Sequence, residues 1–597
     1  YGSMRTDLTK DLTAHHMGID VAYDKNVKID LTKNPNTYLM ESLNFYREQQ
    51  PEEGKEFDDD LFPPNNESLK GNDPLPIGKE KIEWKSAGQI WGEGVSIFGE
   101  AISIDDVTLG MAQDAYFVST MIALSQFPGI IIQLFKTTTL PIDESGIQIC
   151  IQIEGVWTIY CIDDKFPVSK ETGETIFCNS PTKHIWAVLL EKAWAKANGG
   201  YANIINGLPD DILAAFTPFC SIPIDVPKED LESLWQNIKA TTKDNCLMIA
   251  SILENTPGIE SVGLVKNYSM VLNDTKEEET ENATLRMISL RNPFKDMKWT
   301  GDYSEESELW TEPLKKLFDY YPPTEDNNTI IEYNDFIRYF HYITICVPLR
   351  PLKCQIIEIP KEKAADYNVI KLKFGKKGVF SLSIERQSPR FHKDLKVKIE
   401  AFENLLLDKI DKEAKKLVSV ANCYNETLST RVEPGEYLIE INLDYKTAGI
   451  TDIRPYNIHI ASTTDYKIKL VDPDEDLTLM KTIMVPKIES LQRYKLKFKE
   501  QFVFFTGNRF EATSFGFCYM KNKSKETQFL RTQYLLKNFK SIEGEPPKYL
   551  RMEPGSKFFM LFNRVKAGVF FQTGINPGFY KEDTIGSIEP EVKEYGD

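Results

Sequence analysis

Cysteine and histidine are the residues in this chain whose chemistry calls for first attention, because a thiol paired with an imidazole can hydrolyse peptide bonds. The nine cysteines stand at positions 150, 161, 178, 220, 246, 346, 354, 423 and 518. None forms a Cys-x-x-Cys pair, so their spacing is typical of reduced, mostly buried thiols and not of a disulfide framework or a zinc site. The six histidines are His15, His16, His184, His341, His392 and His459. No cysteine precedes Cys150 and no histidine lies between His184 and His341, which restricts where such a pair could form.

The segment 106–117 reads Asp-Val-Thr-Leu-Gly-Met-Ala-Gln-Asp-Ala-Tyr-Phe and resembles the active-site segment of calpains. In that family Asp-x-x-Gln-Gly is followed, after three residues, by Asp-Cys-Trp. Further calpain-like segments follow in the family's order, at residues 61–64, 68–69, 82–85, 189–196, 198–201, 263–266, 290–294, 299–301 and 332–336. The resemblance implies a papain-like α+β protease core with two lobes over residues 57–348.

A papain-like protease needs a cysteine nucleophile, a histidine base, an orienting asparagine and a side-chain amide that stabilises the oxyanion. At the matching positions this chain has Ala115 for the nucleophile, Leu109 for the amide donor and Asn267 for the histidine, and it retains Asn292. Alanine has no heteroatom, leucine has no donor, and asparagine is no base near neutral pH. One such loss would stop turnover, so three together favour a natural pseudoprotease over a laboratory inactivation. We therefore predict no catalytic residue, and we interpret Asn292 as kept for backbone hydrogen bonding.

Calpain cores also bind calcium, and the resemblance implies acidic ligands at two positions where this chain has His184 and Lys298. Calcium requires six or more oxygen ligands, so a cation in place of a carboxylate should abolish or weaken such a site. Asp106, Glu305 and residues 325–326 keep acidic character, and we interpret them as solvated loop residues. Phe294 replaces the tryptophan that shapes the cleft in the family. The sequence thus predicts no metal and no cofactor.

Hydrophobic periodicity predicts the elements that would position these residues. Helices are expected at 114–127, where Asp114 can cap the helix, at 185–197 and at 229–241, with a short helix at 38–49 in a polar arm over residues 1–56. Strands are expected at 147–153, 157–162, 262–272 and 285–291. This mixture predicts the same α+β core as the resemblance implies.

After residue 350 the pattern changes to alternation with a period of two, which predicts antiparallel strands. These strands are expected at 379–384, 395–399, 437–441, 456–460, 466–470, 494–498, 502–505 and 558–562. They predict one β-sandwich over residues 349–475 and a second over 485–597. Arg-Val-Glu-Pro-Gly at 431–435 and Arg-Met-Glu-Pro-Gly at 551–555 indicate that the two are related. The first resembles the C2-like domain of calpains, and the acidic loop 472–476 is interpreted as a linker.

The formal net charge of -18 argues against nucleic acid as the main partner and against general attraction to anionic lipid. No apolar stretch approaches the ~20 residues of a membrane-spanning helix, and no signal peptide is expected. We expect an acidic cytoplasmic protein that binds protein partners in a larger complex.

The leading hypothesis is an inactive scaffold in a cytoskeletal or ciliary assembly, a placement that follows from family analogy. The alternative is a module that binds calcium or phospholipid through its C2-like domains, which leaves membrane-surface binding open. An active cysteine endopeptidase is the least favoured hypothesis.

Overall fold

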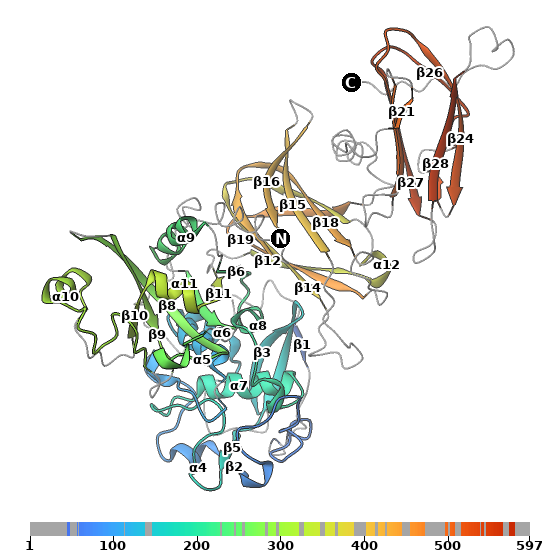
Figure 1. Cartoon of the computed structure of the whole chain (residues 1–597). Coiled ribbons are helices and arrows are strands. Elements are labelled where there is room, and N and C mark those ends of the chain that lie inside the picture. The colour runs from blue at the N-terminus through green and yellow to red at the C-terminus, as the bar shows by residue number, and fades with distance from the viewer. Residues whose placement is uncertain are drawn as a thin grey trace.

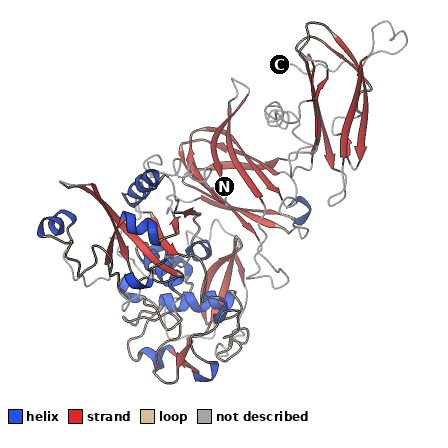
Figure 2. Cartoon of the chain, in the orientation of Figure 1, coloured by secondary structure: helices blue, strands red, loops and turns tan. Residues whose placement is uncertain are grey.

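The computed structural model of this 597-residue chain describes residues 45–47, 57, 59–112, 114–137, 146–226, 230–243, 246–253, 257–280, 284–293, 298–320, 328–346, 353–364, 368–386, 402–411, 416–423, 427–444, 454–471, 496–498, 502–507, 515–537, 539–541, 545–564 and 572–579. Figure 1 shows an elongated chain in which a mixed region, a sheet-rich region and a second sheet-rich region follow one another. Helices are concentrated in the first of these regions, and strands make up most of the other two (Figure 2).

The first lobe is built around helices that pack on short sheets. Its helices are α4 (Ala87–Trp91), α5 (Ala115–Ser125), α6 (Pro128–Leu134), α7 (Trp186–Ala197) and α8 (Pro209–Phe216), with 3-10 turns η1 (Lys79–Lys81), η2 (Ile104–Asp106) and η3 (Tyr201–Asn203). Its strands are β1 (Phe45–Arg47), β2 (Ile82–Ser86), β3 (Ile147–Ile153), β4 (Val156–Ile162) and β5 (Lys165–Ser169). Strand β2 pairs with β5, and β4 lies between β1 and β3. Every residue of α5 is buried, which makes it the central helix of the lobe.

Pro128 begins a helix as well as ending one. The expected helix 114–127 ends at Ser125, and α6 starts with Pro128 in its first turn, where the missing N–H of proline costs nothing.

No single helix in the described ranges is long and apolar enough to span a membrane; only α5 and α6 taken together meet that composition, across a bend of 114°.

The second lobe is a six-stranded antiparallel sheet with the strand order β10-β9-β8-β7-β11-β6. Its strands are β6 (Ser221–Asp225), β7 (Leu247–Ile252), β8 (Tyr268–Glu279), β9 (Thr284–Arg291), β10 (Asn328–Glu332) and β11 (Tyr342–Cys346). Its helices are α9 (Leu231–Lys243), α10 (Glu312–Phe318) and α11 (Tyr333–Tyr339), with the turn η4 (Glu260–Val262). Helix α5 packs against β7 and β8, and one continuous apolar core runs through both lobes.

Two sequence predictions in the first half are wrong. The helix expected at 38–49 is replaced at Phe45–Arg47 by a strand that pairs in parallel with β4, because the edge of β4 offers backbone partners that local periodicity does not reveal. The strand expected at 262–272 begins only at Tyr268, since residues before it form η4 and a turn with Gly263 at φ 76°.

Helix α7 carries charged side chains into the core. Lys192 is fully buried; its Nζ pairs with Asp163 and donates to the carbonyl oxygen of Lys165 at 2.6 Å. Lys196 donates to Asp59 Oδ1 at 2.9 Å and to the carbonyl oxygen of Cys161 at 2.7 Å. Because each ammonium has a carboxylate and a carbonyl partner, α7 is fixed to β4, β5 and the segment at the start of the core.

The first sheet-rich region contains two antiparallel sheets that share one apolar core. One sheet has the order β12-β19-β14-β17, with strands β12 (Lys353–Ile359), β14 (Gly378–Arg386), β17 (Thr427–Val432) and β19 (Tyr456–Ser462). The other has the order β16-β15-β18-β13-β20, with strands β13 (Asn368–Phe374), β15 (Phe402–Asp411), β16 (Lys416–Cys423), β18 (Gly435–Asp444) and β20 (Tyr466–Val471). A short helix, α12 (Lys361–Ala364), precedes β13. The predicted strand 395–399 and the loop 472–476 lie outside the described residues.

The second sheet-rich region also has two sheets around a small core. One sheet has the order β21-β22-β23-β27-β25 and the other β26-β24-β28. The strands are β21 (Leu496–Phe498), β22 (Phe502–Gly507), β23 (Phe515–Asn522), β24 (Gln528–Lys537), β25 (Phe539–Ser541), β26 (Tyr549–Met552), β27 (Lys557–Arg564) and β28 (Gln572–Phe579).

The repeated Pro-Gly segments occupy the same place in both regions. The segment 431–435 joins β17 to β18, and the segment 551–555 leads from β26 to β27. In each case the two strands belong to different sheets of the same region, so each turn carries the chain from one sheet to the other. Gly555 has a φ of 80°, a conformation that glycine adopts without strain.

Seven cysteines have described side chains, and none of these forms a disulfide. Cys150, Cys161, Cys178, Cys220, Cys346 and Cys518 are buried, and Cys246 is half-buried. The prediction of reduced, mostly buried thiols is therefore confirmed for these seven side chains.

The Lys192→Met substitution tests the buried ion pairs of α7. We expect a loss of about 3–5 kcal/mol in the free energy of unfolding, because Asp163 would stay buried without its cationic partner. Calorimetry of the full chain would show this as a lower melting temperature for the transition of the core. The control is Lys70→Met, whose side chain is 64% exposed and should change stability by no more than about 0.5 kcal/mol. Equal shifts for the two variants would contradict the assignment.

Candidate functional site

The site that the sequence singles out begins at the N-terminus of α5. Asp114 occupies the N-cap position, but its side chain makes no capping hydrogen bond, so the prediction that it caps the helix is wrong. Its carboxyl is fully buried beside the carboxyl of Glu191 in α7, and as long as both acids are ionised neither of its oxygens has a hydrogen-bond donor in the described part of the chain. The tertiary contact takes the side chain away from the helix end and into the core.

Asp114 and Glu191 form a buried carboxyl pair. Glu191 is 1% exposed, and its two oxygens accept from the backbone N–H of Cys178 at 3.1 and 3.0 Å. Burial, followed by the neighbouring acid Asp114, raises the pKa of Glu191 well above its usual value, and burial also raises the pKa of Asp114. Two carboxyls can share a hydrogen bond only if one of them holds a proton. In that state the pair links the start of α5 to α7.

Ala115 and Leu109 place apolar groups where the family's chemistry would need polar ones. Ala115 is the first residue of α5 and is 1% exposed. Leu109 is half-buried and packs against the core of the lobes. Gly110 beside it is required, because a Cβ there would lie 1.7 Å from the carbonyl oxygen of Phe177. The backbone path is thus kept while neither side chain can act as nucleophile or donor.

Asn267 stands at the turn before β8 with a φ of 60°, a left-handed conformation that asparagine tolerates better than most residues. It is exposed; its Nδ2 donates to Asn206 Oδ1 at 3.3 Å, and its backbone N–H donates to the carbonyl oxygen of Ile252 at 2.8 Å. These contacts give the residue a bridging role between the lobes.

Asn292 follows β9 and is 4% exposed. Its Oδ1 accepts a hydrogen bond from the hydroxyl of Tyr268 at 2.5 Å, and burial raises the pKa of that tyrosine. The prediction for Asn292 named backbone hydrogen bonding and did not include this side-chain partner, because 24 residues separate Tyr268 from Asn292. In the triad pattern the side-chain oxygen of this asparagine would orient a histidine; here the Oδ1 of Asn292 accepts from the Tyr268 hydroxyl instead.

The fold brings these positions onto neighbouring elements. Ser119, one helical turn after Ala115, donates its hydroxyl to the carbonyl oxygen of Ser269 at 2.6 Å. That contact joins α5 to the start of β8, where Asn267 lies, and Tyr268 joins β8 to Asn292. A second link between the lobes is the ion pair of Arg291 with Asp105 at 3.2 Å.

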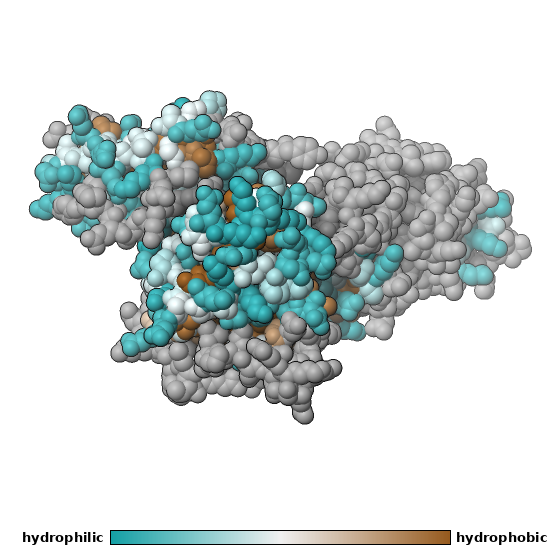
Figure 3. Space-filling view, turned by 90° about the horizontal axis from the view of Figure 1, so that it is seen from below, coloured by the Kyte–Doolittle hydropathy of each residue, from teal (hydrophilic) through white to brown (hydrophobic). Residues whose placement is uncertain are grey.

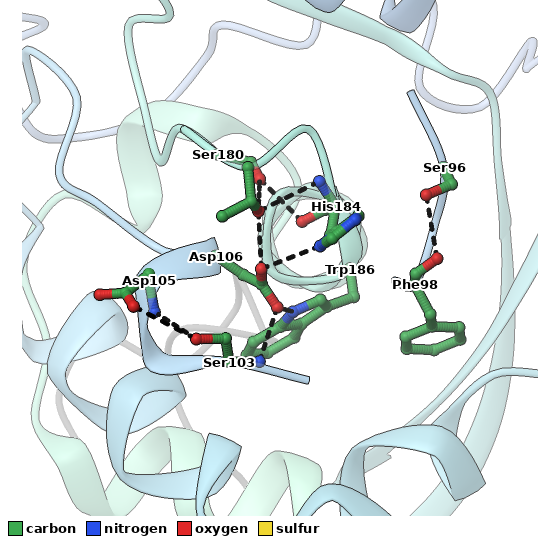
Figure 4. A network of polar contacts seen from close by, with 9 residues as sticks. Ser96, Phe98, Ser103, Asp105, Asp106, Ser180, His184 and Trp186 are labelled. Carbon is green, nitrogen blue, oxygen red and sulfur yellow. Dashed lines mark hydrogen bonds and ion pairs between the residues drawn. The ribbon is translucent and has the colours of Figure 1, made fainter. Parts of the chain in front are cut away.

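Asp106 is fully buried, so its interpretation from the sequence as a solvated loop residue is wrong. Figure 4 shows its carboxylate at the centre of a polar network. Asp106 Oδ2 accepts from the backbone N–H of Ser103 at 2.8 Å and from Trp186 Nε1 at 2.9 Å. Oδ1 contacts the hydroxyl of Thr182 at 2.6 Å and His184 Nδ1 at 3.1 Å. A carboxylate offers about four lone-pair sites, so these four contacts leave none for a cation.

His184 is therefore the internal partner of the retained acid. Because an ionised carboxylate only accepts, Nδ1 of His184 must be the donor. The imidazole packs on Gly99, where an added Cβ would lie 2.2 Å from its Cε1. Sequence reasoning identified His184 as a replacement, but it missed that the ring contacts Asp106, since 78 residues separate the two.

At the second expected calcium position, Lys298 Nζ lies 3.0 Å from Glu305 Oε2. The Lys298 side chain is 64% exposed, so this pair contributes little to stability, but it places a cation beside the remaining acid. Within the described ranges no group of three or more His, Cys, Asp or Glu side chains could hold a metal. The residues present do not fit calcium; residues 325–326 and Phe294 lie outside the described part of the chain.

The carboxyl pair predicts a pH effect on stability. The pKa of Glu191 is higher in the folded chain than in the unfolded chain. Its protonated form therefore stabilises the fold at low pH, and this contribution to the free energy of unfolding is lost as the pH rises through the folded-state pKa. Glu191→Gln keeps an acceptor for Cys178 and a donor for Asp114 but cannot ionise. We expect its melting temperature relative to the wild type to increase between about pH 5 and about pH 8.

The measurement is calorimetry across that pH range. Glu191→Ala is the matched control, and it should be destabilised by about 1–3 kcal/mol throughout because the N–H of Cys178 loses its acceptor. Parallel pH profiles for the wild type and Glu191→Gln would show that Glu191 does not titrate as described.

Comparison with known proteins places this geometry in a family. Residues 57–347 match the family model described as calpain family cysteine protease. The calpain-type cysteine protease ADL1 of Oryza sativa subsp. japonica is 27% identical over 49% of this chain and 14% of its own length. Human Calpain-14 is 25% identical over 49% of this chain and 42% of its own length, and mouse Calpain-5 is 28% identical over 49% of each.

The matches span no more than about half of these relatives. The residues that match the family model lie in the part of the chain that holds both lobes. Among solved structures, the clostridial cysteine protease Cwp84 covers 64% of this chain and 99% of its own at 10% identity, with a TM-score of 0.20 that supports no argument. The ordered calpain-like segments, the α+β architecture and the family match agree over the same residues. Residues 57–347 of this chain belong to the calpain family of cysteine proteases.

Proposed function

We propose that this chain is a catalytically inactive calpain relative that acts as a structural or scaffolding protein. The observation that carries the proposal is Ala115, a buried residue without a heteroatom at the first position of the helix that would present the nucleophile. Leu109 offers no oxyanion donor, and Asn267 is no base. Among Cys150, Cys161 and Cys178, each thiol is buried, so none is a ready substitute.

The electrostatic surroundings also disfavour a substitute nucleophile. Burial, with Glu191 and Asp114 nearby, raises the pKa of Cys178 well above its usual value. Reactive cysteines need the opposite, because the thiolate is the nucleophile. The described thiol closest to the carboxyl pair is therefore held in its protonated form.

A fixed arrangement of domains supports the scaffolding role. Asn457 of β19 donates its Nδ2 to the carbonyl oxygen of Glu154, in the turn between β3 and β4, at 2.7 Å. On the second lobe, β17 packs against β6, and Cys220, just before β6, lies beside Ser383 of β14. The first sheet-rich region thus contacts both lobes and limits their relative movement. Figure 3 shows one face of the molecule, where the described apolar residues form separate small groups among hydrophilic ones.

We place this scaffold inside the cell, in a cytoskeletal or ciliary assembly, and we assign its binding to protein partners. We also propose that the first sheet-rich region is a C2-like domain, as the resemblance of its sequence implies. Crosslinking mass spectrometry on the native complex would test this proposal. If crosslinks form only in the presence of calcium and only to proteins that are bound to membranes, the result would favour the calcium- or phospholipid-binding alternative.

Purified chain should cleave neither casein nor a fluorogenic peptide, with or without calcium. Asn292→Ala, which removes the last residue of the triad pattern, should leave the background rate unchanged. The assay compares product formation with a heat-treated sample and with an active calpain as the positive control. Hydrolysis that Asn292→Ala abolishes would overturn the proposal, because it would require a working site at these positions.

Calcium should not stabilise the core. We expect millimolar calcium to leave the melting temperature of the wild type unchanged, because His184 and Lys298 already pair with the acids that would bind it. In His184→Glu/Lys298→Glu the acids lose these partners and gain a second carboxylate beside each, so the variant should melt lower than the wild type and recover when calcium binds. His184→Gln/Lys298→Gln is the neutral control and should show no recovery. A calcium shift in the wild type would contradict the assignment.

A further inference from the structure

The outer face of one sheet in the first sheet-rich region is rich in lysine. Along β13, Ile370, Leu372 and Phe374 belong to the apolar core, and Lys371 and Lys373 alternate with them on the outer side. Strand β20 is the edge of the same sheet and pairs with β13. The basic face comprises six lysines: Lys371, Lys373, Lys376, Lys377, Lys467 and Lys469.

These lysines are aligned by the register of the two strands. Lys371 lies opposite Lys469, and Lys373 lies opposite Lys467. Lys376 and Lys377 follow β13 in the turn to β14, and both are exposed, as are Lys373, Lys467 and Lys469. Like charges directly opposite each other destabilise a sheet, so this arrangement reduces the stability of the isolated chain.

Two acidic side chains of β18 lie on the same side of the sheet as these lysines: Glu440, opposite Val369, is buried, and Glu436 is half-buried. Glu436 of β18 lies opposite Lys373, and its carboxylate is 3.3 Å from Lys371 Nζ. Asp465, just before β20, lies 3.5 Å from Lys353. Lys373, Lys376, Lys377 and Lys467 make no ion pair with the residues that the structure describes. The basic face therefore carries a local positive excess on a chain whose formal net charge is -18.

Protection of a sheet edge explains only part of the pattern. Exposed lysines on an edge strand prevent a second sheet from adding to it, and this accounts for Lys467 and Lys469. Lys371 and Lys373 lie on β13, which is covered on both sides by β18 and β20. An inner strand needs no such protection, and its outer side need only be polar, so edge protection does not explain why Lys371 and Lys373 carry the same charge as the row beside them.

We propose that the basic face binds an acidic polypeptide segment in extended conformation. Alternate side chains of an extended segment point to one side and repeat every ~6.6–6.8 Å, the same repeat as the lysines along β13 and along β20. A segment with Asp or Glu at alternate positions could thus pair with each row without changing register. This inference does not rest on the loss of hydrolysis by the core.

An extended acidic segment fits the face better than a membrane does. In the described residues the exposed large apolar side chains are Leu61, Leu309 and Leu317, all in the two lobes, so none adjoins the basic face to enter a bilayer. A fluid lipid surface also needs no regular spacing of cations, whereas the alignment of the lysines is regular.

The test uses the full chain and a fluorescein-labelled peptide of alternating Glu and Thr, measured by fluorescence anisotropy at low and high salt. Lys373→Glu/Lys467→Glu should weaken binding by about tenfold or more at low salt, and high salt should weaken binding to the wild type. The control is Lys523→Glu/Lys525→Glu, which makes the same change of charge on exposed lysines of the second sheet-rich region and should bind as the wild type does.

Single Lys467→Glu separates binding from folding. It places opposite charges at one cross-strand pair, so its melting temperature should equal or exceed that of the wild type while its affinity for the peptide falls. Equal affinity of the basic-face variant and its control would overturn the proposal. Tighter binding to phosphatidylserine vesicles than to the peptide, lost in the same variant, would also overturn it in favour of a lipid surface.

Discussion

The burial of ionisable side chains by α7 is the constraint on which the rest of the core depends. Glu191, Lys192 and Lys196 lie within two turns of a helix that is buried along nearly its whole length. Each therefore needs a partner, since a buried polar group without one costs about 1–3 kcal/mol and a buried charge costs more. The partners come from separate parts of the chain: Asp114 at the start of α5, Asp163 after β4, and Asp59 at the start of the core. Satisfying one helix thus fixes the positions of three other segments.

The same demand for polar partners explains other buried groups of the core. Asp106 has a buried carboxylate, and its four contacts come from backbone, hydroxyl, indole and imidazole donors. Asn292 has a buried amide oxygen that accepts from the hydroxyl of Tyr268. Each group thus has an internal partner, and the cost of leaving a buried polar group unsatisfied is a sufficient reason for these contacts.

The two lobes and the first sheet-rich region form a connected body. The Arg291–Asp105 pair and the Ser119–Ser269 hydrogen bond join the lobes, while Asn457 and Ser383 attach the sheets to them. Such a body can present surfaces in fixed relation to one another, as a scaffold must. The basic face lies on a sheet of this body, and β15, β16 and β18 of the same sheet are visible in Figure 1.

Much of this protein follows from the sequence by itself. The central helix beginning after Asp114, the amphipathic strands after residue 350 and the turns at the two Pro-Gly segments are local features, set by residue type and periodicity. That these turns cross from one sheet to the other was known only from the sheet topology. The predicted element boundaries failed where a partner distant in sequence intervened, as at Phe45–Arg47, whose strand exists only because β4 offers an edge.

Only the tertiary structure decided which polar groups meet. His184 with Asp106, Asp114 with Glu191 and Tyr268 with Asn292 are separated by 24 to 78 residues, and no local pattern encodes such pairs. The cross-strand alignment of Lys373 with Lys467 likewise depends on register, which the packing of the apolar face sets. Residue identity determined which side chains stand at the positions of the triad pattern; the folded contacts determined which partners the buried polar groups have.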